Sequence, residues 1–98
     1  MHIITQTRLR IFAKAHPDAE VPLRAWETVI RAKRYKAPHE VKADFGSVDF
    51  PGDAKAVFNI GGNKYRLVVK MMYKWGKVLI LEVWTHEEYD RFLKKGKL

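Results

Sequence analysis

The stretch KAVFNIGGNKYRLVVKMMYKWGKVLILEVW, residues 55–84, decides the fold of this protein. Apolar, aromatic and β-branched residues dominate three runs within it, which predict strands at Lys55–Ile60, Lys64–Tyr73 and Lys77–Trp84. Gly61-Gly62-Asn63 is typical of a tight hairpin turn, and Trp75-Gly76 lies in the second turn. The sequence therefore predicts a three-stranded antiparallel meander.

The segment before the meander predicts two amphipathic helices. Residues 6–16, with Thr5 or Thr7 as the cap, place apolar side chains on one side, and His16-Pro17 ends the helix. Pro22 to Lys36 carries an apolar stripe at helical spacing, formed by Leu23, Trp26, Val29 and Ile30. Both helices are expected to pack on the sheet.

The remaining segments complete an α+β fold. His2 to Thr5 is a short β-prone run, and residues 37–54 predict a long connection with one short helical turn around His39 to Phe45. Thr85 and Glu88 have the spacing of a capping box, so a C-terminal helix is expected to begin there. The expected architecture is two N-terminal helices on a small twisted antiparallel sheet, followed by a C-terminal helix.

Length and composition limit the class of protein. The 98 residues have room for one domain, residues 1–98, and a hydrophobic content of 47% excludes a disordered basic tail. The absence of cysteine excludes disulfides, thiolate metal sites and a cysteine nucleophile. The N-terminus lacks the apolar core of a secretion signal, and the longest apolar-rich stretch, Val78 to Trp84, is too short to span a bilayer. A soluble cytoplasmic protein without a membrane partner is expected.

The net charge of +8 is unevenly distributed along the chain. Residues 37–54 carry one basic and four acidic side chains, whereas residues 55–81 carry six basic side chains and no acidic one. This balance favours a polyanionic partner, with nucleic acid first and an anionic membrane or acidic protein second.

Alternation along the strands predicts a basic face on the sheet. Odd positions of Lys64–Tyr73 are apolar or aromatic and are expected to face the helices, so the cations at even positions face away, namely Lys64, Arg66 and Lys70. Lys55 is expected to join them. In the third strand the expected core residues are Leu79, Leu81 and Val83, and the expected opposite face is Val78, Ile80, Glu82, Trp84 and His86. Lysines on such a face often serve solubility alone, but Arg66 in mid-strand is suited to bind phosphate through two points.

His86 and Tyr89 are the candidates for proton transfer. His86 lies in the first turn of the C-terminal helix, where the helix dipole favours a neutral imidazole, and Tyr89 follows on the same face. The bland alternatives are a surface histidine and a packing aromatic. The four histidines lack metal-ligand spacing, and no glycine-rich phosphate loop opens a helix, so neither a metal nor another cofactor is expected.

Two longer motifs carry a resemblance to a known family. The run from Lys55 to Leu67, KAVFNIGGNKYRL, and the run from Trp84 to Asp90, WTHEEYD, together with the opening Met1 to Thr5, resemble HigB-type toxins of the RelE superfamily. The resemblance spans nearly the whole chain. It implies a RelE-like fold and a ribosome-dependent mRNA endonuclease, the toxin of a type II toxin–antitoxin pair.

The same resemblance implies roles for individual residues. Arg66 would hold the scissile phosphate with help from Lys55, and His86 and Tyr89 would transfer protons, with acid and base left open. Four further cations would bind RNA or the ribosome, including ribosomal RNA: Lys64, Lys70, Arg31 and Arg34. The implied protein partner is a cognate helix-turn-helix antitoxin, through which alone operator DNA would be bound.

Two other function classes are alternatives to an endonuclease. A non-catalytic RNA- or ribosome-binding module would use the same basic face, with Tyr73, Trp75 and Trp84 stacking on bases. A DNA-binding regulator acting alone is disfavoured, because the second helix lacks a helix-turn-helix partner.

Overall fold

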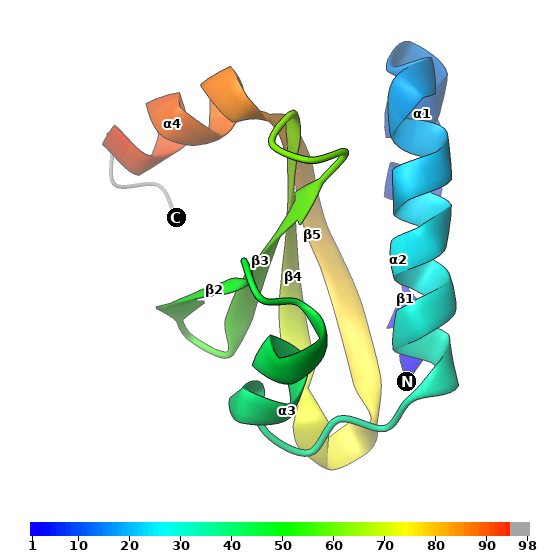
Figure 1. Cartoon of the computed structure of the whole chain (residues 1–98), viewed down its shortest axis with the longest axis vertical. Helices are drawn as coiled ribbons and strands as arrows, with labels where there is room; N and C mark the ends of the chain where they lie inside the picture. Colours follow the sequence, from blue (N-terminus) through cyan, green and yellow to red (C-terminus); the bar gives the residue numbers. More distant parts are fainter. Residues whose placement is uncertain (95–98) are drawn as a thin grey trace.

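A computed structural model describes residues 1–94 as an α+β domain built on a five-stranded mixed sheet (Figure 1). The strand order is β1-β5-β4-β3-β2, and their bounds are His2–Ile4 (β1), Asp49–Gly52 (β2), Lys55–Ile60 (β3), Tyr65–Met72 (β4) and Lys77–Thr85 (β5). The meander of β3, β4 and β5 is confirmed, and so is the short N-terminal strand. That strand pairs in parallel with β5, so the sheet is not purely antiparallel as predicted.

Helices cover the two faces of the sheet unequally. The first face carries α1 (Thr7–Ala15), a 3-10 turn (Pro17–Ala19) and α2 (Glu20–Ala32), and the main core lies beneath them. A short helix, α3 (Pro38–Asp44), follows at one end of the sheet. The C-terminal helix α4 (His86–Lys94) leaves β5 and contributes to a small second cluster on the opposite face. Within residues 1–94, most of that opposite face is not covered by a helix.

The ends of the first two helices differ from the prediction. Thr5 has a left-handed φ of 69°, and α1 begins without a side-chain cap. Helix α2 begins at Glu20, two residues before Pro22, because proline is tolerated in the first turn where amides need no helical partner. It ends at Ala32, since Lys33 is extended, and the basic residues after it lie outside the helix.

The connection from residue 37 to residue 54 is more ordered than predicted. Pro38 starts α3, and Val41 and Val48 are buried in the main core. Strand β2 then pairs with β3 through a turn in which Asp53 and Ala54 have positive φ, the geometry of a two-residue hairpin. The sequence lacks the usual Asn-Gly or Asp-Gly signal here, so the edge strand was missed.

Strand β4 follows the predicted alternation, but β5 does not. Tyr65, Leu67, Val69 and Met71 are all in the main core. In the ladder between β4 and β5, Val68 faces Glu82 and Val69 faces Ile80, so Leu81 is an extra residue. Because of this β-bulge, the side chains of β5 that precede Leu81 point to the faces opposite to those predicted. Val83 faces the core as predicted, but Val78 and Ile80 are core residues and Leu81 packs on the opposite face, contrary to the prediction.

Arg8 of α1 contacts the bulge through a hydrogen bond and an ion pair. Its guanidinium donates to the carbonyl oxygen of Leu81 at 3.1 Å and lies 3.5 Å from the carboxylate of Glu82. Strand β1 pairs with β5 only as far as Leu79, so the Leu81 carbonyl lies on an edge that a neighbouring strand does not cover. Arg8 therefore supplies a hydrogen bond where the ladder has ended.

We expect Arg8→Ala to lower the free energy of unfolding by about 0.5–1.5 kcal/mol, the usual net contribution of one hydrogen bond. Chemical denaturation followed by far-UV circular dichroism measures this change. Arg10→Ala removes an equally exposed cation from the same helix and serves as the control. Equal effects of the two substitutions would show that the bulge does not depend on Arg8.

Candidate active site

Among the residues that the structure describes, Arg66 is the one charged residue that is buried. It is the second residue of β4, lies opposite Asn59 of β3 and Trp84 of β5, and is only 9% exposed. Its side chain belongs to the face away from α1 and α2, as the sequence predicted. A buried guanidinium is costly unless its N–H groups are satisfied, so its partners define its role.

The hairpin turn before β4 holds this guanidinium. Nη2 donates to Oδ1 of Asn63 at 2.7 Å, and Nη1 donates to the carbonyl oxygens of Asn63 and Tyr65 at 3.3 and 3.2 Å. All three acceptors are neutral, so they orient the guanidinium without cancelling its charge. Arginine has five N–H donors, and two of them are not used by these three bonds. Sequence reasoning assigned Asn63 to the turn alone and missed this contact.

Tyr89 of α4 lies over Arg66. The guanidinium carbon is 5.8 Å from the centre of the Tyr89 ring, and the ring packs against Val57 and Val68 with only 7% of the residue exposed. Burial raises the pKa of Tyr89, and the negative charges of Asp49 and Asp90 raise it further against the opposing effect of Arg66. The hydroxyl therefore keeps its proton at neutral pH.

His86 begins α4 beside the same end of β4. The predicted capping box is present, since the Thr85 amide donates to Glu88 at 2.9 Å and the Glu88 amide donates to the Thr85 hydroxyl at 3.2 Å. The backbone N–H of His86 donates to the Lys64 carbonyl at 2.9 Å, which fixes the helix start to β4. Nδ1 of His86 lies 3.3 Å from Oδ2 of Asp90, so the other ring nitrogen, Nε2, points away from this contact.

Arg66 and Tyr89 are thus in contact near the start of β4, where the backbone of His86 is also anchored, and Lys55 does not join them. Lys55 shares the open face with Arg66, but its cross-strand partner is Lys70. Lys70 is four residues from Arg66, or about 13 Å along the strand. Two like charges directly opposite one another destabilise a sheet. An anion bound between Lys55 and Lys70 would reduce this repulsion and so stabilise the sheet.

The other predicted cations lie elsewhere. Lys64 precedes β4, and its ammonium pairs with Asp18 of the 3-10 turn at 3.1 Å, instead of lying on the open face. The Tyr65 hydroxyl also donates to Asp18, and these two bonds lower the pKa of that carboxyl. Arg31 is exposed on α2, on the helical side of the sheet, and Arg34 donates to the carbonyl oxygens of Tyr35, Tyr73 and Lys74.

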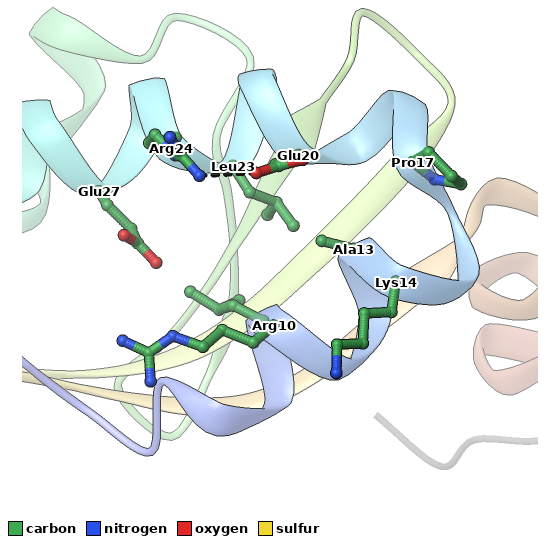
Figure 2. Close-up of a pocket in the computed structure, with 9 residues that line it drawn as sticks. Arg10, Ala13, Lys14, Pro17, Glu20, Leu23, Arg24 and Glu27 are labelled. Atoms are coloured by element: carbon green, nitrogen blue, oxygen red, sulfur yellow. Dashed lines mark hydrogen bonds and ion pairs between the residues drawn. The ribbon is translucent and has the colours of Figure 1, made fainter.

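A groove of about 610 Å³ lies away from these residues, between α1 and α2 (Figure 2). Leu9, Ala13 and Leu23 line it together with charged side chains, and Glu20 and Arg24 on its edge form an ion pair at 2.6 Å. Because it lies on the helical side of the sheet, it does not contribute to the cluster around Arg66. The candidate active site is an open sheet face bordered by α4.

Residues 1–94 contain neither a metal-binding cluster nor a membrane-spanning helix. No group of three or more His, Asp or Glu side chains within that range is arranged to hold a metal ion. None of the helices in that range combines the length and apolarity needed to cross a membrane.

Comparison with known proteins assigns the family. Residues 19–92 match the HigB toxin family, described as the RelE-like toxic component of a toxin–antitoxin system. The chain belongs to this family. The mRNA interferase toxin HigB of Escherichia coli K12 is 40% identical over 94 residues, which cover 94% of this chain and 90% of the relative.

Further relatives carry similar names. The mRNA interferase HigB of Shigella flexneri has the same identity and coverage, and that of Escherichia coli O6:H1 is 25% identical over 96 residues, 96% of this chain and 93% of the relative. The resemblance to HigB-type toxins is therefore confirmed. Membership in the family implies an antitoxin as the partner protein.

We expect Asn63→Ala to lower the free energy of unfolding by about 1–3 kcal/mol, because it removes a hydrogen bond to a buried charge. Asn63→Asp keeps an acceptor for Arg66 and is expected to restore most of this loss. Thermal and urea denaturation measure both effects. Asn59→Ala, opposite Arg66 on β3, is the control. If Asn63→Ala is as stable as the wild type, Asn63 does not hold Arg66.

Proposed function

We propose that this protein is an mRNA interferase, an endoribonuclease that cuts mRNA on the ribosome and so inhibits translation until its antitoxin binds. The observation that carries the proposal is the buried Arg66, oriented by neutral acceptors that leave two of its N–H donors unused, with the Tyr89 ring packed over the guanidinium. The names of the HigB relatives support the same activity.

The chemistry proposed for this cluster needs no metal ion. A base removes the proton of a ribose 2′-hydroxyl, and the resulting oxygen attacks the adjacent phosphorus. The bond to the 5′-oxygen of the next nucleotide breaks, and an acid gives that oxygen a proton, which leaves a cyclic phosphate and a 5′-hydroxyl. Arg66 would bind the non-bridging phosphate oxygens, whose charge grows as the pentavalent species forms.

The geometry favours one assignment of acid and base. Tyr89 has a raised pKa and holds its proton, so it is suited to act as the acid that protonates the leaving 5′-oxygen. His86 is suited to act as the base through Nε2, because the Asp90 carboxylate beside Nδ1 favours the tautomer with its proton on Nδ1. Sequence reasoning left this choice open.

The lysines would then guide the RNA chain. At about 13 Å from Arg66, Lys55 and Lys70 are suited to bind a neighbouring phosphate of the same strand instead of the scissile one. Lys64 and Arg31 lie toward the helical side and Arg34 lies at the turn between β4 and β5, and we propose that these three cations contact ribosomal RNA. Phosphate contacts of this kind would make binding depend strongly on salt.

The remaining parts of the proposal concern the cell. An enzyme that cuts mRNA during translation would work in the cytoplasm. The antitoxin would be a helix-turn-helix protein, and operator DNA would be bound only through it.

Cleavage of mRNA in a purified translation system tests the activity. Arg66→Ala should abolish cutting while binding to ribosomes is retained, because only the bond to the scissile phosphate is lost. Arg10→Ala, which removes a cation from α1, should cut normally. If the wild type binds ribosomes and never cuts under translation, the protein is a non-catalytic binding module and the proposal is wrong.

The acid and base roles predict opposite effects on the pH dependence of single-turnover cleavage. Tyr89→Phe keeps the packed ring and should slow cleavage about 10²–10⁴-fold, the usual contribution of one proton-transfer group. His86→Gln should slow it similarly and abolish the rise in rate on the acidic side of the pH profile, which reports the base.

In the wild type the rate should fall only at alkaline pH above the ordinary range of tyrosine, because the pKa of Tyr89 is raised. Tyr89→Phe should remove this fall. If Tyr89→Phe instead removes the rise at low pH, the two roles are reversed.

A further inference from the structure

The turn between β4 and β5 presents an indole ring to solvent. Trp75 belongs to the 3-10 turn Tyr73–Trp75 and is 63% exposed. The other two aromatic residues considered for base stacking are already engaged within the protein. Trp84 stacks on Phe92 with ring centres 4.3 Å apart, and Tyr73 packs against the main core. Trp75 is therefore the one of the three with a free face.

The backbone that carries Trp75 is held firmly. Arg34 donates through Nη1 to the Tyr73 carbonyl at 2.6 Å and through Nη2 to the Lys74 carbonyl at 3.3 Å. Gly76 closes the turn in a left-handed conformation, and a side chain there would lie 2.8 Å from Nε of Arg34. The Gly76 carbonyl also accepts a hydrogen bond from the His2 amide at 2.9 Å. The indole is thus presented from a fixed position, which reduces the entropy lost when a ligand binds.

The surroundings of the ring are cationic. Nζ of Lys74 lies 5.2 Å from the centre of the Trp75 ring. Lys77 begins β5 on the open face, since its neighbour Val78 faces the core, and Lys70 lies on the same face of β4. Residues 55–81 contain no acidic side chain. A ligand that combines a flat π surface with negative charge would match this ring and the lysines near it.

We propose that Trp75 forms a stacking subsite for an unpaired RNA base, with Lys74 and Lys77 neutralising the flanking phosphates. Stacking on aromatic side chains beside cations is the usual way in which proteins bind single-stranded RNA. The subsite lies at the end of the open face remote from Arg66, six residues along β4, or about 20 Å from Arg66 to Met72. It extends the proposed RNA path beyond Lys55 and Lys70, and it rests on the proposed function.

The RNA base fits this turn better than an apolar protein surface does. Interfaces between proteins have apolar centres from which lysine is depleted, whereas the residues on either side of Trp75 in the turn are Lys74 and Gly76. Of the other exposed large apolar residues, Ile11, Val21 and Val29 lie on α1 and α2, on the helical side of the sheet, and Leu93 lies on α4. Trp75 is accordingly a single flat ring among cations.

The test measures RNA binding apart from cleavage. A fluorescent single-stranded RNA with 2′-O-methyl riboses cannot be cut, so its affinity for the protein can be followed by anisotropy. Trp75→Ala should weaken binding about 5- to 150-fold, the range found for the loss of one stacked base. Trp75→Phe keeps a π face and should restore most of the affinity. Val21→Ala, which shortens a side chain 77% exposed on α2, is the matched control and should bind as the wild type does.

Salt dependence separates stacking from charge. Trp75→Ala should leave the slope of log affinity against log salt unchanged, whereas Lys77→Ala should reduce it by about one phosphate contact. A second arm uses purified ribosomes. Loss of affinity for both the oligonucleotide and ribosomes assigns the base to mRNA, and loss for ribosomes alone assigns it to ribosomal RNA.

Three outcomes would overturn the proposal. Trp75→Ala could bind both RNA ligands as tightly as the wild type, Val21→Ala could weaken binding equally, or Trp75→Ala could weaken only the complex with the antitoxin. Because the binding assays do not depend on cleavage, they remain decisive even if the wild type fails to cut mRNA. Loss of cutting in Arg66→Ala tests the enzyme, and loss of binding in Trp75→Ala tests the subsite.

Discussion

The extra residue in β5 is the constraint on which the arrangement of this domain depends. Strand β5 must bury Val78 and Ile80 before the bulge and Val83 after it against the same helices. Strict alternation would send one of these groups to the opposite face. The bulge at Leu81 allows both to face the core, and it leaves Trp84 directly opposite Arg66. The strand then continues into α4, whose Tyr89 packs over that pair.

The open face consequently has two ends with different chemistry. At the end covered by α4, Tyr89, Val57 and Val68 form a small apolar cluster beside Arg66, and all four residues are buried. A guanidinium in such surroundings interacts with a phosphate more strongly than one in water does. At the other end Lys55 and Lys70 face each other without a helix above them. Positioning of a reacting group suits the first end, and attraction of a flexible polyanion suits the second.

Sequence reasoning succeeded where local patterns decide the structure. The alternation in β4 placed Arg66 correctly, and the spacing of Thr85 and Glu88 fixed the start of α4, because both depend on neighbours within a few residues. It failed where pairing between distant strands decides. The bulge at Leu81 depends on register with β4, and the contact of Lys64 with Asp18 depends on how the 3-10 turn packs beside the hairpin.

The contrast between Lys64 and Arg66 explains why neighbouring cations differ in what they offer an anion. The carboxylate of Asp18 compensates Lys64, so a phosphate would have to displace it. The carbonyl and amide oxygens of the turn satisfy part of the guanidinium of Arg66 but carry no net charge, so these hydrogen bonds do not cancel its positive charge. Burial makes an uncompensated charge unfavourable in the free protein, and a bound phosphate relieves that cost. A site of this kind is therefore poised for an anion before the anion arrives, which is the property that stabilisation of a charged transition state requires.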